Sequence, residues 1–261
     1  MHDGLHEQQY RRVNGLVTMS LDGGVATLRL TDPARRNALS PAMIRELEAA
    51  VEGALASGAR ALVVCADPPV FCAGGSLDSL RDRTVPLMDT YRGFRALLAA
   101  PVPTVAAVAG PAIGAGMNLP LCCDVVLVSP SARFDPRFLD VGIHPGGGHL
   151  WLLQQRVGSQ GAAALVLMGD VLDGAEAVEH GLAWRCVAED ELEPAAVALA
   201  TRAAGRDPEL VARTKATLRA SVDNADEAIE LEREAQEWSM ARPAFDVAVR
   251  RAQAAIARRS G

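Results

Sequence analysis

The chain alternates between short apolar runs and segments in which apolar residues recur every three or four positions. Residues 16–32 predict two strands joined by the turn signal Asp22-Gly23-Gly24. Residues 60–66 and 101–110 predict two buried strands. A serine followed by proline at 40–41 is typical of a helix start. The apolar face of that helix is formed by Ile44, Leu47, Val51 and Leu55.

The pattern becomes helical throughout after residue 189. Residues 183–187 are the last predicted strand, and Leu231, Ala235 and Trp238 then fall on one helix face. Strands that alternate with helices and are followed by helices alone predict an α/β fold. We expect a core over residues 1–190 and a helical C-terminal region over residues 191–261. Apolar faces on the helical region favour contacts with other subunits.

Composition and charge narrow the possible functions. The chain has 261 residues, of which 49% are hydrophobic and 22% charged, and its formal net charge is −6. This charge argues against nucleic-acid binding. No apolar run approaches the roughly 20 residues of a membrane-spanning helix, so no membrane contact is expected. The five cysteines lack metal-ligand spacing, so we expect no metal site and interpret them as reduced thiols of a cytoplasmic protein.

Two glycine-rich turns carry the candidate chemistry. PAIGAGMNLPLCCD (111–124) and FCAGGSLDSL (71–80) each follow a predicted strand and lead into a short helix. Their small residues let a ligand approach the backbone closely. A turn that opens a helix also leaves N–H groups unpaired at the positive end of the helix dipole. Two such turns predict an oxyanion hole built from two loops.

Five segments together resemble the signature blocks of the crotonase, or enoyl-CoA hydratase/isomerase, superfamily. They are RNALS (36–40), VFCAGGSLDSL (70–80), GPAIGAGMNLPLCCDVVLVS (110–129), RFDPRFLDVGIHPGGG (133–148) and GAEAVEHGLAWRCV (174–187). They occur in the family's order and at its spacing. The resemblance implies a crotonase-like spiral of ββα units with a helical C-terminal trimerisation region. It also implies a homotrimer or a dimer of trimers.

The resemblance further implies how an acyl-CoA thioester would bind. Two backbone N–H groups, of Gly75 and Ala115, would stabilise the enolate of the thioester. Coenzyme A is part of the substrate, so no separate cofactor is expected. Its contacts would come from Arg36, Ala38, Ala73 and Leu77. Either Arg35 or Arg36 is a candidate for contact with a phosphate.

Two positions depart from the pattern of the family's hydratases. These enzymes use two glutamates to activate water, and the matching positions here hold Asn118 and Phe138. An amide can hold a water but cannot take its proton, and a phenyl ring can do neither. Asn118 therefore remains a candidate site residue, but direct two-glutamate hydration is not expected. Some relatives with isomerase activity carry an aspartate at the position of Gly146, which is also absent.

Asp140 and His144 are the candidates to replace the missing glutamates. Asp140 lies two residues beyond Phe138, and the imidazole of His144 suits acid–base work. Structural interpretations stay open, because Asp140 can pair with Arg137 and His144 can be a hydrogen-bonded structural group. The sequence predicts an acyl-CoA-binding enzyme that stabilises a thioester enolate. The alternatives are a non-catalytic acyl-CoA binder, or an isomerase, thioester hydrolase or decarboxylase of the same family.

Overall fold

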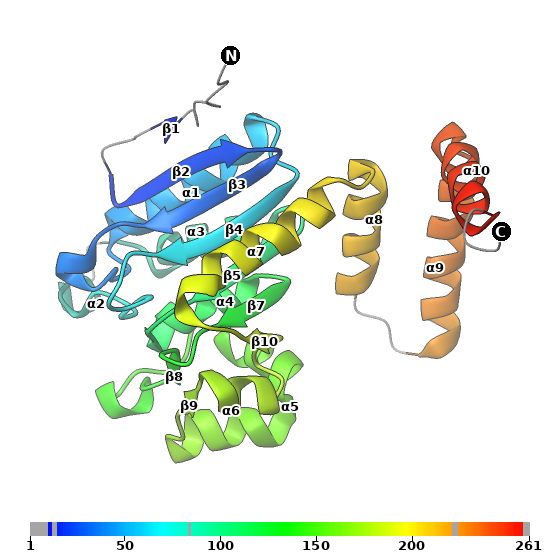
Figure 1. Cartoon of the computed structure of the whole chain (residues 1–261). Coiled ribbons are helices and arrows are strands. Elements are labelled where there is room, and N and C mark those ends of the chain that lie inside the picture. Colours follow the sequence, from blue (N-terminus) through cyan, green and yellow to red (C-terminus); the bar gives the residue numbers. More distant parts are fainter. Residues whose placement is uncertain (1–9, 12–14, 83–84, 221–223, 258–261) are drawn as a thin grey trace, which may run out of the picture. The chain divides into compact units, whose positions relative to one another are not determined.

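The structure is a computed structural model that describes residues 10–11, 15–82, 85–220 and 224–257 (Figure 1). The chain divides into two compact units, Met1–Gly205 and Arg206–Gly261. The first unit contains the sheets. It also includes the helix after residue 190 that the sequence analysis grouped with the C-terminal region. No helix of the described residues is both long enough and apolar enough to cross a membrane.

Seven strands form the main sheet within the described part of the first unit, in the order β1–β2–β3–β4–β5–β7–β10. Their bounds are Tyr10–Arg11 (β1), Val17–Asp22 (β2), Val25–Leu30 (β3), Ala61–Ala66 (β4), Thr104–Val108 (β5), Val125–Val128 (β7) and Arg185–Cys186 (β10). Neighbours from β1 to β3 are antiparallel, and neighbours from β3 to β10 are parallel. The predicted hairpin and both predicted buried strands are confirmed.

Helices cover both faces of the main sheet. Alternate residues of β4 point to opposite faces, so Leu62 and Val64 belong to the core that includes α1 (Pro41–Ala56) and α3 (Arg92–Ala99). The other face is covered by α7 (Glu189–Ala204). Its buried residues are Leu192, Ala196, Ala200 and Ala204. The sequence therefore builds an α/β core, as predicted.

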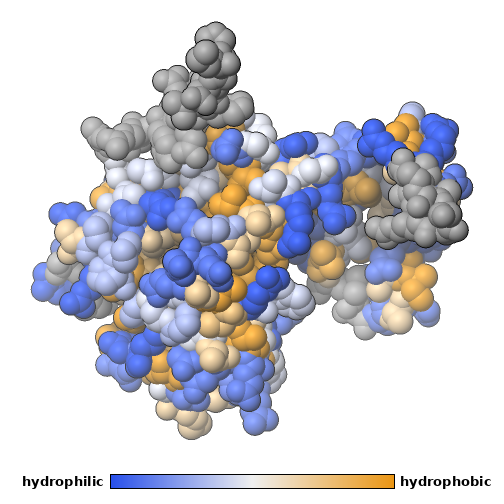
Figure 2. Space-filling view, in the orientation of Figure 1, coloured by the Kyte–Doolittle hydropathy of each residue, from blue (hydrophilic) through white to orange (hydrophobic). Residues whose placement is uncertain are grey.

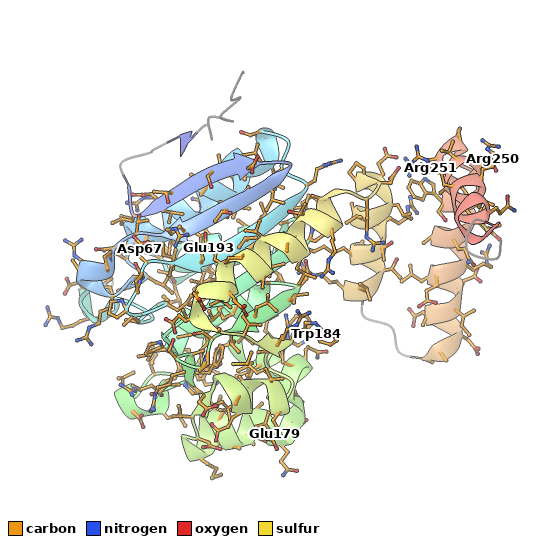
Figure 3. The ribbon with its side chains drawn as sticks, in the orientation of Figure 1. Asp67, Glu179, Trp184, Glu193, Arg250 and Arg251 are labelled. Carbon is orange, nitrogen blue, oxygen red and sulfur yellow. The ribbon has the colours of Figure 1, made fainter. Side chains whose placement is uncertain are left out.

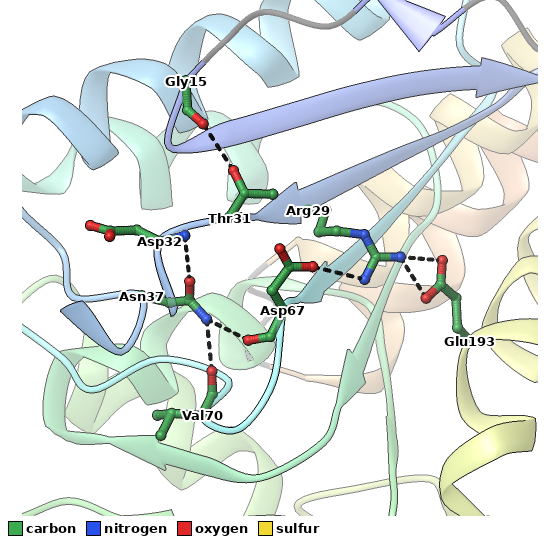
Figure 4. A network of polar contacts seen from close by, with 8 residues as sticks. All are labelled: Gly15, Arg29, Thr31, Asp32, Asn37, Asp67, Val70 and Glu193. Atoms are coloured by element: carbon green, nitrogen blue, oxygen red, sulfur yellow. Dashed lines mark hydrogen bonds and ion pairs between the residues drawn. The ribbon is translucent and has the colours of Figure 1, made fainter. Parts of the chain in front are cut away.

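One ion-pair cluster joins α7 to the sheet. Arg29 of β3 contacts Glu193 of α7 at 2.5 Å and Asp67 at 3.7 Å (Figure 4). Partial burial lowers the pKa of the Arg29 guanidinium, but electrostatic interactions with Cys65, Glu193 and Asp67 together raise it above its ordinary value. The cluster thus holds α7 beside the end of β4, where the chain enters the first glycine-rich turn.

A second sheet is formed by strands that follow β5 in the chain, and the sequence pattern did not predict these strands. Its strands are β6 (Pro111–Ile113), β8 (Arg133–Asp135) and β9 (Leu172–Asp173). Their order is β6–β8–β9, with β6 and β8 parallel. Runs of two or three residues are too short for a period of two to stand out. This sheet carries β6 directly into the second glycine-rich turn.

The remaining helices of the first unit are α2 (Leu77–Asp82), α4 (Asn118–Cys122), α5 (His149–Met168) and α6 (Gly174–Glu179). The 3-10 helix Gly114–Met117 precedes α4, so the predicted short helix is present but starts as a tighter coil. Asp173 and Glu176 form a capping box at α6. Such a box depends only on two residues three positions apart, so it can be recognised from the sequence pattern.

The second unit consists of α8 (Pro208–Arg219), α9 (Ala225–Met240) and α10 (Pro243–Ala257). Two guanidinium groups lie over the ring of Trp238 of α9. Arg213 and Arg242 are 4.2 Å and 4.6 Å from the centre of its ring. Arg242 also pairs with Asp207, the N-cap of α8, at 2.9 Å. Leu231 and Ala235 line the same apolar groove as Trp238, which confirms the predicted helix face.

Candidate active site

The first glycine-rich turn is held in place by Asn37. This residue is fully buried and has a left-handed backbone with φ 52°. Its side-chain NH₂ donates to the carbonyls of Asp67 and Val70 at 2.9 and 2.7 Å, and its carbonyl oxygen accepts from the Asp32 N–H at 2.9 Å (Figure 4). Because all three partners are backbone groups, Asn37 fixes the path of the chain from the end of β4 into the turn.

The two glycine-rich turns touch each other through their backbones. A Cβ added at Gly74, which has φ 86°, would lie 2.5 Å from the carbonyl oxygen of Ile113. A Cβ added at Gly116 would overlap with the carbonyl oxygen of Cys72. Only glycine fits at both positions. The bridge between Cys72 and Ala112 completes the contact, so the two turns form one structural element.

The N–H groups of Gly75 and Ala115 have no hydrogen-bond partner in the described part of the chain. In the parallel bridge of Leu39 with Gly75, Leu39 donates to the carbonyl of Gly74 at 2.8 Å and accepts from the N–H of Ser76 at 3.4 Å. That pairing leaves the N–H of Gly75 pointing away from Leu39. Ala115 lies in the first turn of a 3-10 helix, where N–H groups have no partner within the helix. Neither N–H is bonded to any group of the described residues.

Gly75 and Ala115 line the same cavity, which has a volume of about 670 Å³. Much of the remaining wall is apolar, and it includes Leu39, Phe94, Ile113, Phe138, Val141 and Ile143. Among the lining residues that the structure describes there is no aspartate or glutamate. The cavity can therefore offer two amide donors to an oxygen atom, but it offers no carboxylate to take a proton.

Residues expected to contact coenzyme A are only partly brought together. Arg36 and Ala73 line the cavity, and the N–H of Ala73 donates to the carbonyl of Arg36 at 3.0 Å. Arg35 lies outside this lining and pairs with Asp32 at 3.5 Å, so Arg36 is the better placed of the two arginines. Ala38 is half-buried and is not in the lining. Leu77 begins α2, but its side chain lies outside the described residues.

Asn118 is buried and forms part of a closed polar network. Its NH₂ group donates to the carbonyl of Gly146 at 3.0 Å, and its carbonyl oxygen lies 2.8 Å from Nδ1 of His149. Since that oxygen can only accept, the proton of the neutral imidazole is on Nδ1. Nε2 of His149 is buried and has no partner among the described residues. The Asn118 amide therefore fixes the loop that contains Gly146, and Asn118 is not among the residues that line the cavity.

Phe138 lies between the cavity and His149. Its side chain is among the cavity-lining residues, and its ring packs edge-on against the imidazole with a centroid distance of 4.8 Å. Burial lowers the pKa of His149 to about 4. The imidazole is thus neutral at physiological pH and covered by an apolar ring.

His144 and Asp140 lie on the same loop and are both exposed, but only His144 lines the cavity. His144 lines the cavity, and its Nδ1 is 2.7 Å from the carbonyl of Pro145. A carbonyl only accepts, so Nδ1 carries the proton and Nε2 of the neutral ring keeps its lone pair. Asp140 is exposed in the 3-10 helix Leu139–Val141 and is absent from the lining. Arg137 pairs with Asp135 at 2.5 Å, which is a different partner from the one that the sequence suggested.

Tyr91 is a lining residue that sequence reasoning did not select. Its apolar spacing with Phe94 and Leu98 indicates a core position, and the ring does pack against the core. The same ring also reaches the cavity. No local pattern signals this second role, because it depends on the loop around Gly146, which is distant in sequence.

The sequence is similar to known proteins over most of its length. The family model described as enoyl-CoA hydratase/isomerase matches residues 20–245. A probable enoyl-CoA hydratase, EchA14, of Mycobacterium tuberculosis is 43% identical over 211 residues, which are 78% of this chain and 82% of the relative. A probable enoyl-CoA hydratase of Rhodobacter capsulatus is 35% identical and covers 68% of this chain and 70% of its own.

Solved structures extend the similarity to the whole fold. A protein of Magnetospirillum magneticum AMB-1 named as an enoyl-CoA hydratase/carnithine racemase superimposes with a TM-score of 0.84 at 28% identity, over 90% of this chain and 94% of its own. A Thermobifida fusca YX protein named as an enoyl-CoA hydratase, in complex with acetoacetyl-CoA, gives a TM-score of 0.80 at 30% identity, over 87% and 95%. The chain has the crotonase fold, and it belongs to the enoyl-CoA hydratase/isomerase, or crotonase, superfamily of enzymes.

Proposed function

We propose that the cavity binds an acyl-CoA thioester and stabilises its enolate. The observation that carries this proposal is the pair of unpartnered N–H groups of Gly75 and Ala115, which lie on two touching turns and line one cavity. The oxygen of a thioester carbonyl gains negative charge when C2 loses a proton. Preorganised backbone donors contribute roughly 3–4 kcal/mol each to such a transition state. The relative solved with acetoacetyl-CoA supports this substrate class.

Arg36 is the proposed contact for a phosphate of coenzyme A. It is exposed, it lines the cavity beside the first turn, and its backbone is in the left-handed conformation with φ 54°. A guanidinium at this position supplies positive charge locally, although the chain as a whole carries a net charge of −6. The segment that binds the nucleotide end of the substrate is thus the same one that holds the first turn.

His144 is the proposed base. Its Nε2 keeps a lone pair in the neutral ring, and the side chain lines the cavity that also contains both amides. In the proposed step the proton on C2 of the acyl chain moves to Nε2 while the electrons shift to the thioester oxygen. Return of a solvent proton to C2 gives hydrogen exchange at C2. In an enoyl chain whose double bond lies between C3 and C4, return of the proton to C4 gives isomerisation. We favour proton transfer over hydration because the described lining of the cavity has no pair of carboxylates to activate a water.

A non-catalytic acyl-CoA binder is the second candidate. It is favoured by the positions that the resemblance assigns to the hydratase glutamates, where Asn118 is tied to Gly146 and Phe138 presents an apolar ring. In this case the amides hold a ligand carbonyl without any proton transfer. Both candidates require acyl-CoA binding, so an assay of proton transfer separates them.

Exchange of the C2 protons in D₂O is the test of choice, because it reports enolate formation whatever the final reaction is. Butyryl-CoA and but-3-enoyl-CoA, whose saturated C2 carries acidic protons, are incubated with the protein. Deuterium incorporation is followed by mass spectrometry while binding is measured by calorimetry. We expect exchange with the wild-type protein and a loss of at least about a hundredfold in His144→Gln. Asp140→Asn is the matched control on the same loop, and it should exchange as fast as wild type.

Three results would contradict the proposal in different ways. Binding without exchange favours the non-catalytic binder. Rapid hydration of crotonyl-CoA contradicts the view that this cavity does not activate water. Failure to bind any acyl-CoA contradicts the assignment of the cavity itself.

We also propose that the protein assembles as a homotrimer or a dimer of trimers in the cytoplasm. The first unit exposes Leu167, Met168 and Trp184 at 63%, 78% and 69%. Trp184, which directly precedes β10, is labelled in Figure 3. Hydrophobic residues also reach the surface between hydrophilic ones in Figure 2. Large exposed apolar side chains are typical of interfaces. All five cysteines are free and four are buried, which fits a reducing compartment. Light scattering of the purified protein measures the assembly state.

A further inference from the structure

Asn118 joins the two segments that supply a proposed donor and the proposed base. It follows Ala115 by three residues and begins α4 directly after the second glycine-rich turn. Its NH₂ group donates to the carbonyl of Gly146 at 3.0 Å, and Gly146 follows His144 by two residues. One buried amide therefore links the segment of the Ala115 N–H to the loop that carries His144.

This loop packs directly against the Asn118 amide. Gly147 has a left-handed backbone with φ 69°, and a Cβ added there would lie 2.8 Å from Nδ2 of Asn118 and 3.2 Å from Cδ2 of Phe94. Only a residue without a side chain allows this approach. The carbonyl of Gly146 also accepts from the N–H of His149, at 3.4 Å. The position of the loop thus depends on the amide that it contacts.

His149 determines which way round the Asn118 amide lies. Turning the amide over would exchange its NH₂ group and its oxygen. The Gly146 carbonyl only accepts, so it requires the NH₂ group, and the oxygen then faces Nδ1 of His149 at 2.8 Å. Among the described residues this oxygen has no second donor. Without the imidazole it would be buried and unpaired, which weakens the arrangement that holds Gly146.

The contact with Asn118 is what distinguishes a histidine at position 149 from an apolar residue. The side chain is buried, and its Nε2 has no partner in the described part of the chain. Its ring packs against the ring of Phe138, which lines the cavity. An apolar side chain in such surroundings would bury no unpaired nitrogen. The polar role of the imidazole is therefore its Nδ1–H.

We propose that His149 is a positioning residue for proton transfer, which acts through the amide of Asn118 on the loop that carries His144. This inference rests on the proposed function, because it concerns the geometry of the same reaction. Arg36 and Gly75, which also line the cavity, belong to other segments of the chain. Loss of the Nδ1–H should therefore slow proton transfer while acyl-CoA binding stays nearly unchanged.

Two substitutions of similar shape test this role. His149→Asn keeps an NH₂ group on the second side-chain carbon, whereas His149→Leu has the same branched shape and no donor. Both lose the ring, so a purely structural role would affect them equally. Exchange of the C2 protons of butyryl-CoA in D₂O is measured at saturating ligand, and dissociation constants are measured by calorimetry. We expect exchange to slow at least about tenfold in His149→Leu and at most about threefold in His149→Asn. Both dissociation constants should stay within about twofold of wild type.

A double-variant cycle tests whether His149 acts through Asn118. Asn118→Leu should slow exchange by itself. Adding His149→Leu to this variant should slow it no further, because the amide that His149 orients is gone. Losses that multiply would show that the two side chains act separately, and would overturn the proposal. Circular dichroism verifies that each variant is folded, and His149→Met is the donor-free replacement if His149→Leu is not.

The outcomes separate this inference from the proposed function. Equal exchange rates in His149→Asn and the donor-free variant would refute the role of His149, while acyl-CoA binding and proton transfer by wild type stand. A loss of binding in the donor-free variant as large as its loss of exchange would also refute it. If wild type exchanges no C2 proton, the proposed proton transfer and the inference fail together.

Discussion

Lowering the pH from 7 to 5 should destabilise the fold through His149. The side chain is 1% exposed, its Nδ1 donates to Asn118 at 2.8 Å, and its Nε2 has no partner in the described part of the chain. A second proton on Nε2 would be placed beside the ring of Phe138 instead of an acceptor. Burial therefore lowers the pKa of His149 from 6.5 to about 4.

The direction in which the free energy of unfolding changes with pH depends on how many protons the folded and unfolded states bind. Between pH 4 and 6.5 the unfolded chain binds a proton at this residue that the folded chain does not, so the free energy of unfolding rises with pH. One pKa unit corresponds to about 1.4 kcal/mol. The loss from pH 7 to pH 5 is therefore about 2 kcal/mol, and it approaches about 3 kcal/mol below pH 4.

Urea unfolding at pH 5, 6 and 7 measures this loss in wild type and in His149→Gln. Glutamine keeps a donor for Asn118 but does not titrate. Protein concentration is held fixed, and far-UV circular dichroism reports the folded fraction. Carboxylates titrate in both proteins, so the difference between the two pH dependences isolates His149. We expect wild type to lose about 2 kcal/mol more than the variant. Parallel pH dependences would refute the reasoning.

Three further substitutions test the architecture around the cavity. Gly116→Ala should abolish deuterium exchange at C2 of the acyl chain and lower the melting temperature, because its methyl group overlaps with the Cys72 carbonyl. Unchanged deuterium exchange would contradict the contact between the turns. Asn37→Ala should cost about 3 kcal/mol of unfolding free energy in urea, from three lost hydrogen bonds at about 1 kcal/mol each; a loss below about 1 kcal/mol would contradict its role. Arg36→Ala should weaken coenzyme A binding severalfold in calorimetry, whereas the control Arg35→Ala should not.

The parts of the fold that depend on local pattern are predictable from the sequence. The hairpin, the α1 start at Ser40 and the capping box at Asp173 each depend on residues within a few positions of one another. The two glycine-rich turns also stand out locally, since Gly74 and Gly116 lie in runs of small residues. Their contact with each other is not local. It was expected because both turns present N–H groups at the start of a helix, and the resemblance to a family then assigned Gly75 and Ala115 as the donors.

The walls of the cavity could not be read in the same way. Asp140 and His144 are four residues apart and both are exposed, yet only His144 lines the cavity. Asp140 lies in the 3-10 helix Leu139–Val141, from which Val141 reaches the cavity instead. Asn118 has a side chain suited to holding a water, but packing places it against His149 instead. The direction of a side chain in a short irregular segment depends on residues that are distant in sequence. The periodicity of apolar residues gives no information about such contacts.

The contact between the two glycine-rich turns has a consequence for how this chain can evolve. The amides that we propose to bind the thioester carbonyl lie on turns whose backbones touch at Gly74 and Gly116, where no side chain intervenes. The groups that would decide what happens to the acyl chain, such as Tyr91, Phe138 and His144, come from other segments. Substitutions in those segments can change the chemistry while the thioester stays anchored at the same point. In such a site the backbone amides of the two turns stay the same, while the side chains that line the cavity can change.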